Sequence, residues 1–446
     1  MNIPLHRLYP YIESQARQIW HNHVLIYRFS PHGSKDLHDL SLLSDHSLDD
    51  LVLCPHVYCN DQEPLDWTKY QTTTNQVPEI QPFCENVGLD KQNLRDYPID
   101  IWDWALLLHS EQGGYNLAQY QTSGFITVHY WSHAIIARDW FRYAKHVQQQ
   151  KRVKKFFLIY NRAWSGTREY RLKFADLLID FDLTVHCQTW VNVVDPECNT
   201  HYQQYNFCNP QWKPRHQLEN YFDSTQADSK DSADFNLVDY ETTEVEVVLE
   251  TLFDDDRVHL TEKILRPISL SQPFILVGSA GSLKYLRDYG FETFDSVWSE
   301  EYDLIQDPVQ RLQSVATLMQ TIINWSPEVR AQRMLQAQAI AKRNHERFFS
   351  DEFDQQILCE LKTNLTTAFD YLHQHNTSSR WIKWYRIMHE LSSEQLQSLN
   401  QSQIDHGDHH RPISRFTTAQ WKKFLTQAQQ YQARQIETER IPFKVN

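Results

Sequence analysis

A short segment in the second half of the chain carries residue types that bind phosphorylated ligands. Thr261 can cap a helix that begins with Glu262 and Lys263, and an apolar strand further along ends at Gly278. Unpaired N–H groups at a helix N-terminus carry partial positive charge, so a diphosphate can bind there, and Lys263 would add a full charge. The Glu262 carboxylate could accept hydrogen bonds from a ribose diol. The pattern indicates a site for a ribose diphosphate.

A purely structural interpretation of these residues stays open. Arg266 follows Glu262 by four residues, the spacing at which ion pairs form along a helix, and Lys263 would then be solvated. Pro267 is expected to bend or end this helix.

The elements that must position these residues alternate between strand and helix. We expect a strand over Phe156–Tyr160, a helix over Tyr170–Ile179, a strand over Leu183–His186 and, after a polar stretch and a helix, a strand over Phe274–Val277. This order is typical of a parallel α/β unit. Two later helices are predicted to start at proline, because a capping side chain precedes it in Asp307-Pro308 and in Ser326-Pro327.

The first part of the chain is predicted to contain short strands, at Val24–Phe29, Leu51–Tyr58, Ile101–Leu108 and Phe125–Tyr130. A helix over Ser132–Val147 is expected to follow. The basic cluster at residues 151–155 then precedes the next strand, which puts the first domain boundary near residue 150. Beyond about residue 350 the sequence is helix-like and rich in Gln.

Two loops of this first part carry carboxylates that could act as a general base. Asp61 and Glu63 follow the strand Leu51–Tyr58, and Glu111 follows the strand Ile101–Leu108. Open α/β sheets bind ligands at the carboxyl ends of their strands, so each acid could face a substrate. For each of them, capping the next helix or lying in a solvated turn is the alternative.

The order of the segments resembles the donor-binding part of GT-B glycosyltransferases of the fucosyltransferase and exostosin-like type. The resemblance rests on the Thr-Glu-Lys string at 261–263, the short helix, proline and strand after it, and Tyr-Gly-Phe-x-Thr-Phe at 289–294. It implies an α/β fold with two Rossmann-like domains facing a cleft. We expect an acceptor-binding domain at 1–150, a nucleotide-sugar-binding domain at 151–350 and a helical extension at 351–446.

The resemblance also implies roles for single residues. In that family the matching Glu and Lys hold the ribose and the phosphates of a nucleotide sugar, which here are Glu262 and Lys263. Arg168 aligns with an arginine that reaches the donor phosphates, and Arg162, beside Asn161 in the same loop, is its rival. A planar guanidinium suits this role because it binds two phosphate oxygens at once. In the alternative, Arg168 and Arg171 lie on a solvated helix face.

The resemblance further implies an inverting transfer, in which a carboxylate takes the proton of the acceptor hydroxyl. The loop at Glu63 resembles the loop that carries the base in fucosyltransferases, so Glu63 is our first choice, with Asp61 second and Glu111 third. No DxD string ends a strand, and the acidic run at 254–256 is expected to be a turn. We therefore expect a metal-independent enzyme with no permanently bound cofactor and a UDP- or GDP-linked sugar as donor substrate.

The whole pattern looks like glycosyltransferases encoded by large tailed bacteriophages, some of which modify 5-hydroxymethylcytosine in phage DNA, including with arabinose. Our lead hypothesis for the acceptor is therefore that base, extruded from the duplex. The DNA phosphates would be contacted by basic side chains, namely Arg138, Arg142, Lys151 and Lys154. Two alternatives stay open: a fucosyltransferase-like enzyme acting on lipopolysaccharide or another surface glycan, and a non-catalytic protein that binds nucleotide or glycan.

Composition limits these hypotheses. Among 446 residues, 43 Lys and Arg against 57 Asp and Glu give a charge of −14, which provides no general attraction to nucleic acid. Only 10 glycines argue against repeated glycine-rich phosphate loops. Seven cysteines without a CxxC pair favour a reducing compartment, and no apolar run is long enough to insert in a membrane. We expect a cytoplasmic protein, in the host cell if phage-encoded, and no metal at the His-rich string Asp405–His410.

Overall fold

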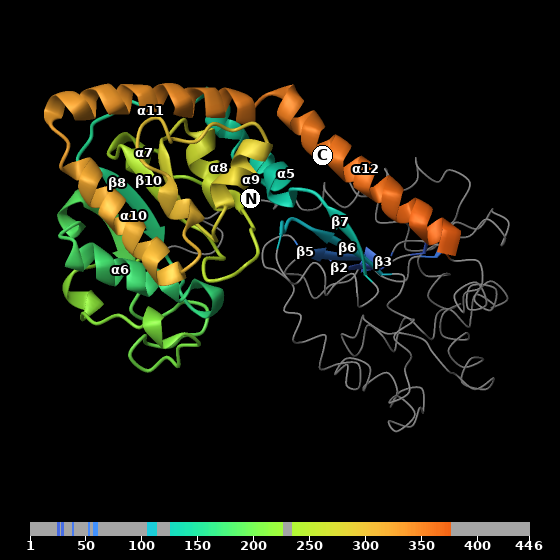
Figure 1. Cartoon of the computed structure of the whole chain (residues 1–446), viewed down its shortest axis with the longest axis horizontal. Coiled ribbons are helices and arrows are strands. Elements are labelled where there is room, and N and C mark those ends of the chain that lie inside the picture. Colours follow the sequence, from blue (N-terminus) through green and yellow to red (C-terminus); the bar gives the residue numbers. More distant parts are fainter. Residues whose placement is uncertain are drawn as a thin grey trace. The chain divides into compact units, whose positions relative to one another are not determined.

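The computed structural model describes residues 25–26, 28–30, 38–39, 52–53, 57–60, 105–113, 125–225 and 234–375 (Figure 1). The chain divides into two compact units. Unit 1 comprises Met1–Ile3, Ser110–Tyr115 and Trp131–Leu358, whereas unit 2 comprises Pro4–His109, Asn116–Tyr130 and Cys359–Asn446. The predicted division at residues 150 and 350 stays a prediction.

Unit 1 is built on a four-stranded parallel sheet with the strand order β11-β10-β8-β9. Every side chain of β10 and β11 is buried, as expected for a parallel sheet covered on both faces. The strands are β8 (Phe157–Asn161), β9 (Cys187–Val191), β10 (Val245–Leu249) and β11 (Phe274–Val277).

The sheet of unit 1 is wound outward from the pair formed by β8 and β10. From β8 the chain passes through α6 (Tyr170–Asp180) to β9 on one side, and from β10 through α8 (Glu262–Ser269) to β11 on the other. Since crossovers between parallel strands are right-handed, α6 and α8 cover opposite faces. Accordingly α10 (Pro308–Ile323) packs against α6, whereas α5 (Ser132–Trp140) and α11 (Pro327–Phe348) pack against α8.

The remaining described helices are two short ones in unit 1, a long one that starts there, and several 3-10 helices. The helices α7 (Leu237–Glu241) and α9 (Ser282–Asp288) flank the sheet strands in sequence, and α12 (Asp351–His375) begins in unit 1 and continues into unit 2. Short 3-10 helices lie at Arg142–His146, Gly166–Arg168, Thr184–His186, Pro210–Trp212, Leu218–Asn220 and Glu301–Leu304. None of the helices in the described ranges combines the length and apolarity needed to cross a lipid bilayer.

Unit 2 contains a second, five-stranded sheet with the order β3-β2-β5-β6-β7. All neighbours in it are parallel except β2 and β3, and a separate parallel pair joins β1 to β4. The strands are β1 (Leu25–Ile26), β2 (Arg28–Ser30), β3 (His38–Asp39), β4 (Val52–Leu53), β5 (Val57–Asn60), β6 (Ala105–His109) and β7 (Phe125–His129). Parallel sheets with helices confirm the predicted α/β class, whereas the GT-B arrangement of two facing domains stays a prediction.

Several predicted elements are confirmed because local contacts define them. Strand β11 has its predicted bounds, and α10 and α11 both begin at the proline that follows their cap. The Asp307 carboxylate accepts from the N–H of Gln310 at 2.8 Å, and the Ser326 hydroxyl accepts from the N–H of Val329 at 3.3 Å.

The strand predicted at Leu183–His186 is wrong, because the apolar residues there terminate a helix. Asp182, with φ of 54°, follows α6 in the left-handed conformation, and the N–H of Leu183 donates to the carbonyl of Leu178 at 2.8 Å. This is the bonding pattern of a Schellman C-cap, in which an apolar residue packs back on the helix. Leu183 is fully buried there, and strand β9 begins only at Cys187.

Two further corrections concern β10 and α5. Strand β10 was not expected, because Glu246 interrupts its apolar run and acidic residues flank it. The helix predicted over Ser132–Val147 is α5 only as far as Trp140, and a 3-10 helix follows. Pro267 lies inside α8, which ends two residues later at Ser269.

Candidate functional site

The carboxyl edge of the sheet in unit 1 is the candidate site. Between β8 and β10 the chain leaves in opposite directions along the sheet, and such switch points are where open α/β sheets bind ligands. Three predicted cations lie on the segments that leave this edge: Arg162 directly after β8, Arg168 just before α6, and Lys263 in the first turn of α8.

The end of β10 fixes the start of α8 through a buried carboxylate. The Glu250 side chain accepts from the Thr261 hydroxyl at 2.6 Å and from the Thr261 N–H at 3.2 Å. Thr261 is the N-cap, as predicted, and its Oγ1 accepts from the N–H of Lys263 at 3.4 Å. The helix N-terminus is therefore held against the strand edge.

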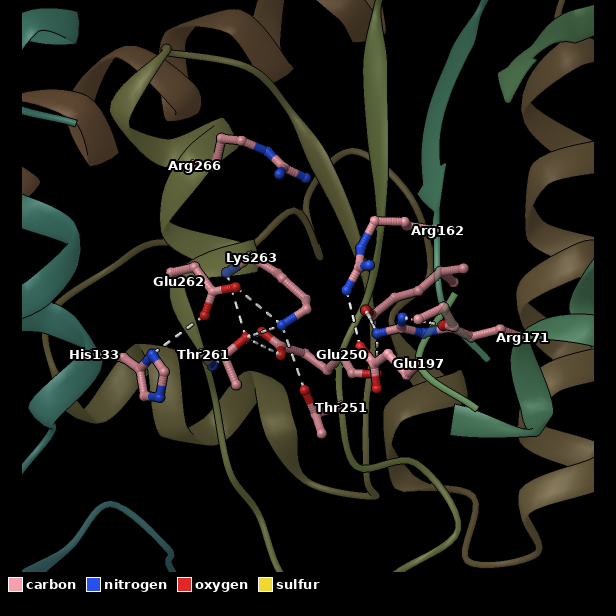
Figure 2. Close-up of polar contacts among 12 residues, drawn as sticks. His133, Arg162, Arg171, Glu197, Glu250, Thr251, Thr261, Glu262, Lys263 and Arg266 are labelled. Atoms are coloured by element: carbon pink, nitrogen blue, oxygen red, sulfur yellow. Dashed lines mark hydrogen bonds and ion pairs between the residues drawn. The ribbon is translucent and has the colours of Figure 1, made fainter. Parts of the chain in front are cut away.

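The Lys263 ammonium lies over this helix end. Its Nζ donates to Thr261 Oγ1 at 3.2 Å, to Thr251 Oγ1 at 3.4 Å and to Glu262 Oε1 at 3.0 Å. Figure 2 shows the side chain reaching from α8 past Thr261 to Thr251, which follows the end of β10. The Lys263 side chain is 24% exposed.

Glu262 is buried between two nitrogen groups. Its Oε2 lies 3.3 Å from Nδ1 of His133, a fully buried residue of α5, and its Oε1 accepts from Lys263 (Figure 2). Burial alone would raise the pKa of Glu262, but the Lys263 charge and the contact with His133 outweigh it and hold the pKa well below its usual range. Glu262 is therefore ionised.

The alternative in which Glu262 pairs with Arg266 is wrong. Arg266 Nη2 donates to Glu246 Oε1 of β10 at 2.8 Å, and Arg266 Nε donates to the Tyr240 hydroxyl at 2.9 Å. Figure 2 shows Arg266 turned away from Glu262. Lys263 is likewise half-buried and hydrogen-bonded, not fully solvated.

The two rival arginines converge on one carboxylate. Arg162 Nη2 lies 2.8 Å from Glu197 Oε1, and Arg168 Nη2 lies 2.5 Å from Glu197 Oε2. Both arginines are part-exposed, at 25% and 17% of their side chains. We call Arg162, Arg168 and Glu197 the arginine cluster.

The loop that carries Glu197 is tied to the loop after β8 by Asp195, which sequence reasoning missed. Its carboxylate accepts from the N–H groups of Trp164 at 2.6 Å and Ser165 at 2.9 Å, and from those of Glu197 at 2.8 Å and Cys198 at 3.1 Å. Burial would raise the pKa of Asp195, yet these four bonds lower it. The Asp195-Pro196 pair is a turn signal that could have drawn attention to this loop.

Arg171 connects the loop after β8 to the end of β10. It is buried, and its guanidinium donates to the carbonyls of Ala163 at 2.7 Å, Leu249 at 2.8 Å and Glu250 at 3.1 Å. The proposed solvated helix face is therefore wrong for Arg171. Because α6 contacts the Glu250 carbonyl while α8 contacts its carboxylate, the N-terminal ends of both helices meet at the end of β10.

Two other predicted donor-site residues have roles in packing. Asn161 is buried at the end of β8, and its amide donates to the carbonyl of Arg171 at 3.1 Å. At Gly278 an added Cβ would lie 2.7 Å from Oγ of Ser282, and the Gly278 carbonyl accepts from Arg311 at 3.2 Å. Gly278 therefore allows α9 to approach the end of β11.

Of the three candidate bases, only Glu111 lies within the described residues; Asp61 and Glu63 lie outside them. Glu111 is fully buried in unit 1. The next residue, Gln112, forms an antiparallel bridge with Val258, with N···O distances of 2.9 and 3.0 Å. Glu111 is thus next to the strand-like segment that leads into α8.

The four candidate DNA contacts differ in availability. Arg138 donates to the carbonyls of Phe348 and Ser350, and Nζ of Lys151 donates to those of Tyr240 and Thr243. The enclosure of the Lys151 ammonium lowers its pKa to about 8. These two cations serve the fold. Arg142, beside the Tyr143 ring, and Lys154 are exposed.

Across the described ranges, no three His, Cys, Asp or Glu side chains are grouped so that they could hold a metal ion. The acidic run at 254–256 is irregular, as expected for a turn, and Asp255 pairs with Arg257 at 2.5 Å. The string Asp405–His410 lies outside the described residues. No protein-family model, curated protein or solved structure matches this chain.

Proposed function

We propose that this protein is a nucleotide-sugar-dependent glycosyltransferase whose donor binds at the carboxyl edge of the sheet in unit 1. The observation that supports this most is the gathering of Lys263, Arg162 and Arg168 at the ends of two adjacent parallel strands where the winding of the sheet reverses. Fixed cations beside a helix N-terminus suit a diphosphate leaving group.

In this proposal each residue has one role. Lys263 and the arginines neutralise the diphosphate, and the ionised Glu262 accepts hydrogen bonds from the ribose diol. The acceptor hydroxyl oxygen attacks the anomeric carbon while the bond from that carbon to the diphosphate oxygen breaks. A carboxylate, Glu63 with Asp61 and Glu111 as alternatives, takes the hydroxyl proton, and the nucleoside diphosphate leaves with inversion at the anomeric carbon. The protein groups supply the charge stabilisation, so a metal ion is not required.

For the acceptor we propose 5-hydroxymethylcytosine in DNA, on the sequence resemblance. Because Arg138 and Lys151 serve the fold, the phosphate contacts of this proposal fall to Arg142 and Lys154. Lipopolysaccharide or another surface glycan is the alternative acceptor, and binding without transfer is the alternative activity.

A donor panel tests the proposal. The full chain is incubated with UDP- and GDP-linked sugars and with either duplex DNA containing 5-hydroxymethylcytosine or oligosaccharides, and products are detected by mass shift. A sugar-sized mass gain on the modified DNA alone supports the DNA acceptor, and a gain on oligosaccharide alone replaces it. Donor binding without any transfer supports the non-catalytic alternative, and no donor binding refutes the proposal.

Two variants test the donor residues. Lys263→Ala should weaken donor binding at least tenfold. A charge-assisted hydrogen bond from a partly buried ammonium group to a phosphate oxygen contributes more than about 1.4 kcal/mol to the binding free energy. The matched control is Lys284→Ala on α9, since that lysine is 72% exposed and pairs with Asp288 along its own helix. Glu63→Gln should bind donor normally and lose transfer; full activity would move the base to Asp61 or Glu111.

A further inference from the structure

We propose that Glu197 is an internal counter-ion that occupies the phosphate position of the arginine cluster, so that a diphosphate binds only after the Glu197 carboxylate is displaced. The inference rests on the proposed function, because it concerns the same donor site. The two oxygens of the Glu197 carboxylate each pair with a different guanidinium, at 2.8 Å from Arg162 and 2.5 Å from Arg168. Two oxygens of a diphosphate would use the same two donors.

Charge favours the exchange. Two guanidinium groups share the carboxylate of Glu197, and Lys263 lies at the same sheet edge. A diphosphate carries more than one negative charge, so it matches these cations better than a single carboxylate does. A neutral ligand gains nothing by displacing Glu197.

The backbone of the loop confines the movement to one side chain. Asp195 accepts from the N–H of Glu197 at 2.8 Å and from that of Cys198 at 3.1 Å, and the same carboxylate holds the loop after β8. The loop therefore stays in place when the ion pairs break. The Glu197 side chain is 36% exposed, so rotation about its own torsions brings the carboxylate into water.

The expected size of the effect follows from the exposure of these ion pairs. We call the arrangement closed when Glu197 pairs with both arginines and open when its carboxylate is in water. Two part-exposed ion pairs of ordinary strength favour the closed arrangement by about tenfold. The apparent affinity of a ligand that needs the open arrangement falls by the same factor, about tenfold. Removing the Glu197 charge should therefore raise the apparent affinity about tenfold.

The test measures binding of inorganic pyrophosphate to the full chain by titration calorimetry at fixed ionic strength. Glu197→Gln, which keeps the shape and removes the charge, should bind about tenfold more tightly than the wild type. Glu292→Gln is the matched control, because Glu292 forms a two-oxygen pair with Arg343 elsewhere in unit 1 and should leave the affinity unchanged. Glu197→Ala repeats the test with the side chain removed.

A double variant shows whether the arginines carry the effect. In Glu197→Gln combined with Arg168→Gln, the gain should be lost. If Glu197→Gln and Glu197→Ala bind pyrophosphate no better than the wild type while Lys263→Ala still weakens binding, the counter-ion inference is wrong and the donor site stands. If neither the wild type nor any variant binds pyrophosphate, the arginine cluster is not a phosphate site, and the inference and the proposed donor site both fall.

Discussion

The carboxylate of Asp195 is predicted to hold together the two loops that carry the arginine cluster. Its Oδ2 accepts from the N–H groups of Trp164 at 2.6 Å and Ser165 at 2.9 Å, and its Oδ1 accepts from those of Glu197 at 2.8 Å and Cys198 at 3.1 Å. In Asp195→Asn an NH₂ group replaces one of these oxygens, so two N–H donors lose their acceptor. Each loss costs ~1–3 kcal/mol.

A total of about 3 kcal/mol corresponds to roughly 150-fold more frequent opening of the loop that loses its acceptor. Hydrogen exchange followed by mass spectrometry measures the opening. The amide protons that it follows are hydrogen-bonded to the Asp195 carboxylate and belong to Trp164, Ser165, Glu197 and Cys198. The peptide whose two N–H groups face the new NH₂ group should exchange about two orders of magnitude faster in the variant, whereas the peptide of the other loop keeps its oxygen acceptor. Asp180→Asn is the control, since that acid forms a pair with the exposed Arg215.

Unchanged exchange in both loops of Asp195→Asn would refute this account of the loop. The pH dependence gives a second check. The four N–H donors lower the pKa of Asp195 in the folded state, so its stabilising effect is complete above the unfolded value of about 3.9 and is lost as the pH falls through the folded pKa. The difference between wild type and variant should therefore be full at pH 7 and shrink below pH 4.

Three other predictions concern stability of unit 1 in urea. Glu246→Ala should lower the free energy of unfolding by about 3–5 kcal/mol, because it leaves the buried Arg266 guanidinium without its carboxylate partner. Glu292→Ala, which removes an exposed pair, should lower it by less than about 1 kcal/mol. Equal effects of the two variants would contradict the role of the buried pair. Gly278→Ala should cost about 1–3 kcal/mol through its 2.7 Å clash with Ser282, and Ser282→Ala should recover part of that loss. Burial raises the pKa of Asp303 to about 6, so unit 1 should gain stability as the pH falls from 7 to 5. Burial also raises the pKa of Glu300 to about 6, so Asp303→Asn should reduce that gain and not abolish it.

Local signals in the sequence determined the elements whose contacts lie within a few residues. The caps Asp307 and Ser326 each bond an N–H three residues ahead, and Thr261 bonds the N–H of Lys263 two residues ahead. Such contacts depend only on neighbouring residue types, so the starts of α8, α10 and α11 could be predicted. The α/β class followed from the alternation of apolar runs and helical segments.

The partners of the charged residues were decided by the tertiary structure. Spacing along α8 favoured Glu262 for Arg266, but β10 brings Glu246, 20 residues away, to that guanidinium instead. The same strand escaped prediction, because its buried glutamate is acceptable only with this partner. Tertiary contacts also bring Glu197 to Arg162 across 35 residues, and to Arg168 across 29.

The sequence by itself thus determined that Arg162 follows the end of a strand and that Lys263 lies in the first turn of a helix capped by Thr261, since chain order fixes those positions. It did not reveal β10, the strand whose end lies beside Lys263. It could not determine how their charges are balanced. A charged side chain near a sheet edge pairs with the opposite charge that the packing of distant loops brings within about 3 Å. That distance cannot be predicted from the spacing of the residues in the sequence. Asp195 and Glu197, which organise the arginine cluster, became visible only when the loops after β8 and β9 were placed side by side.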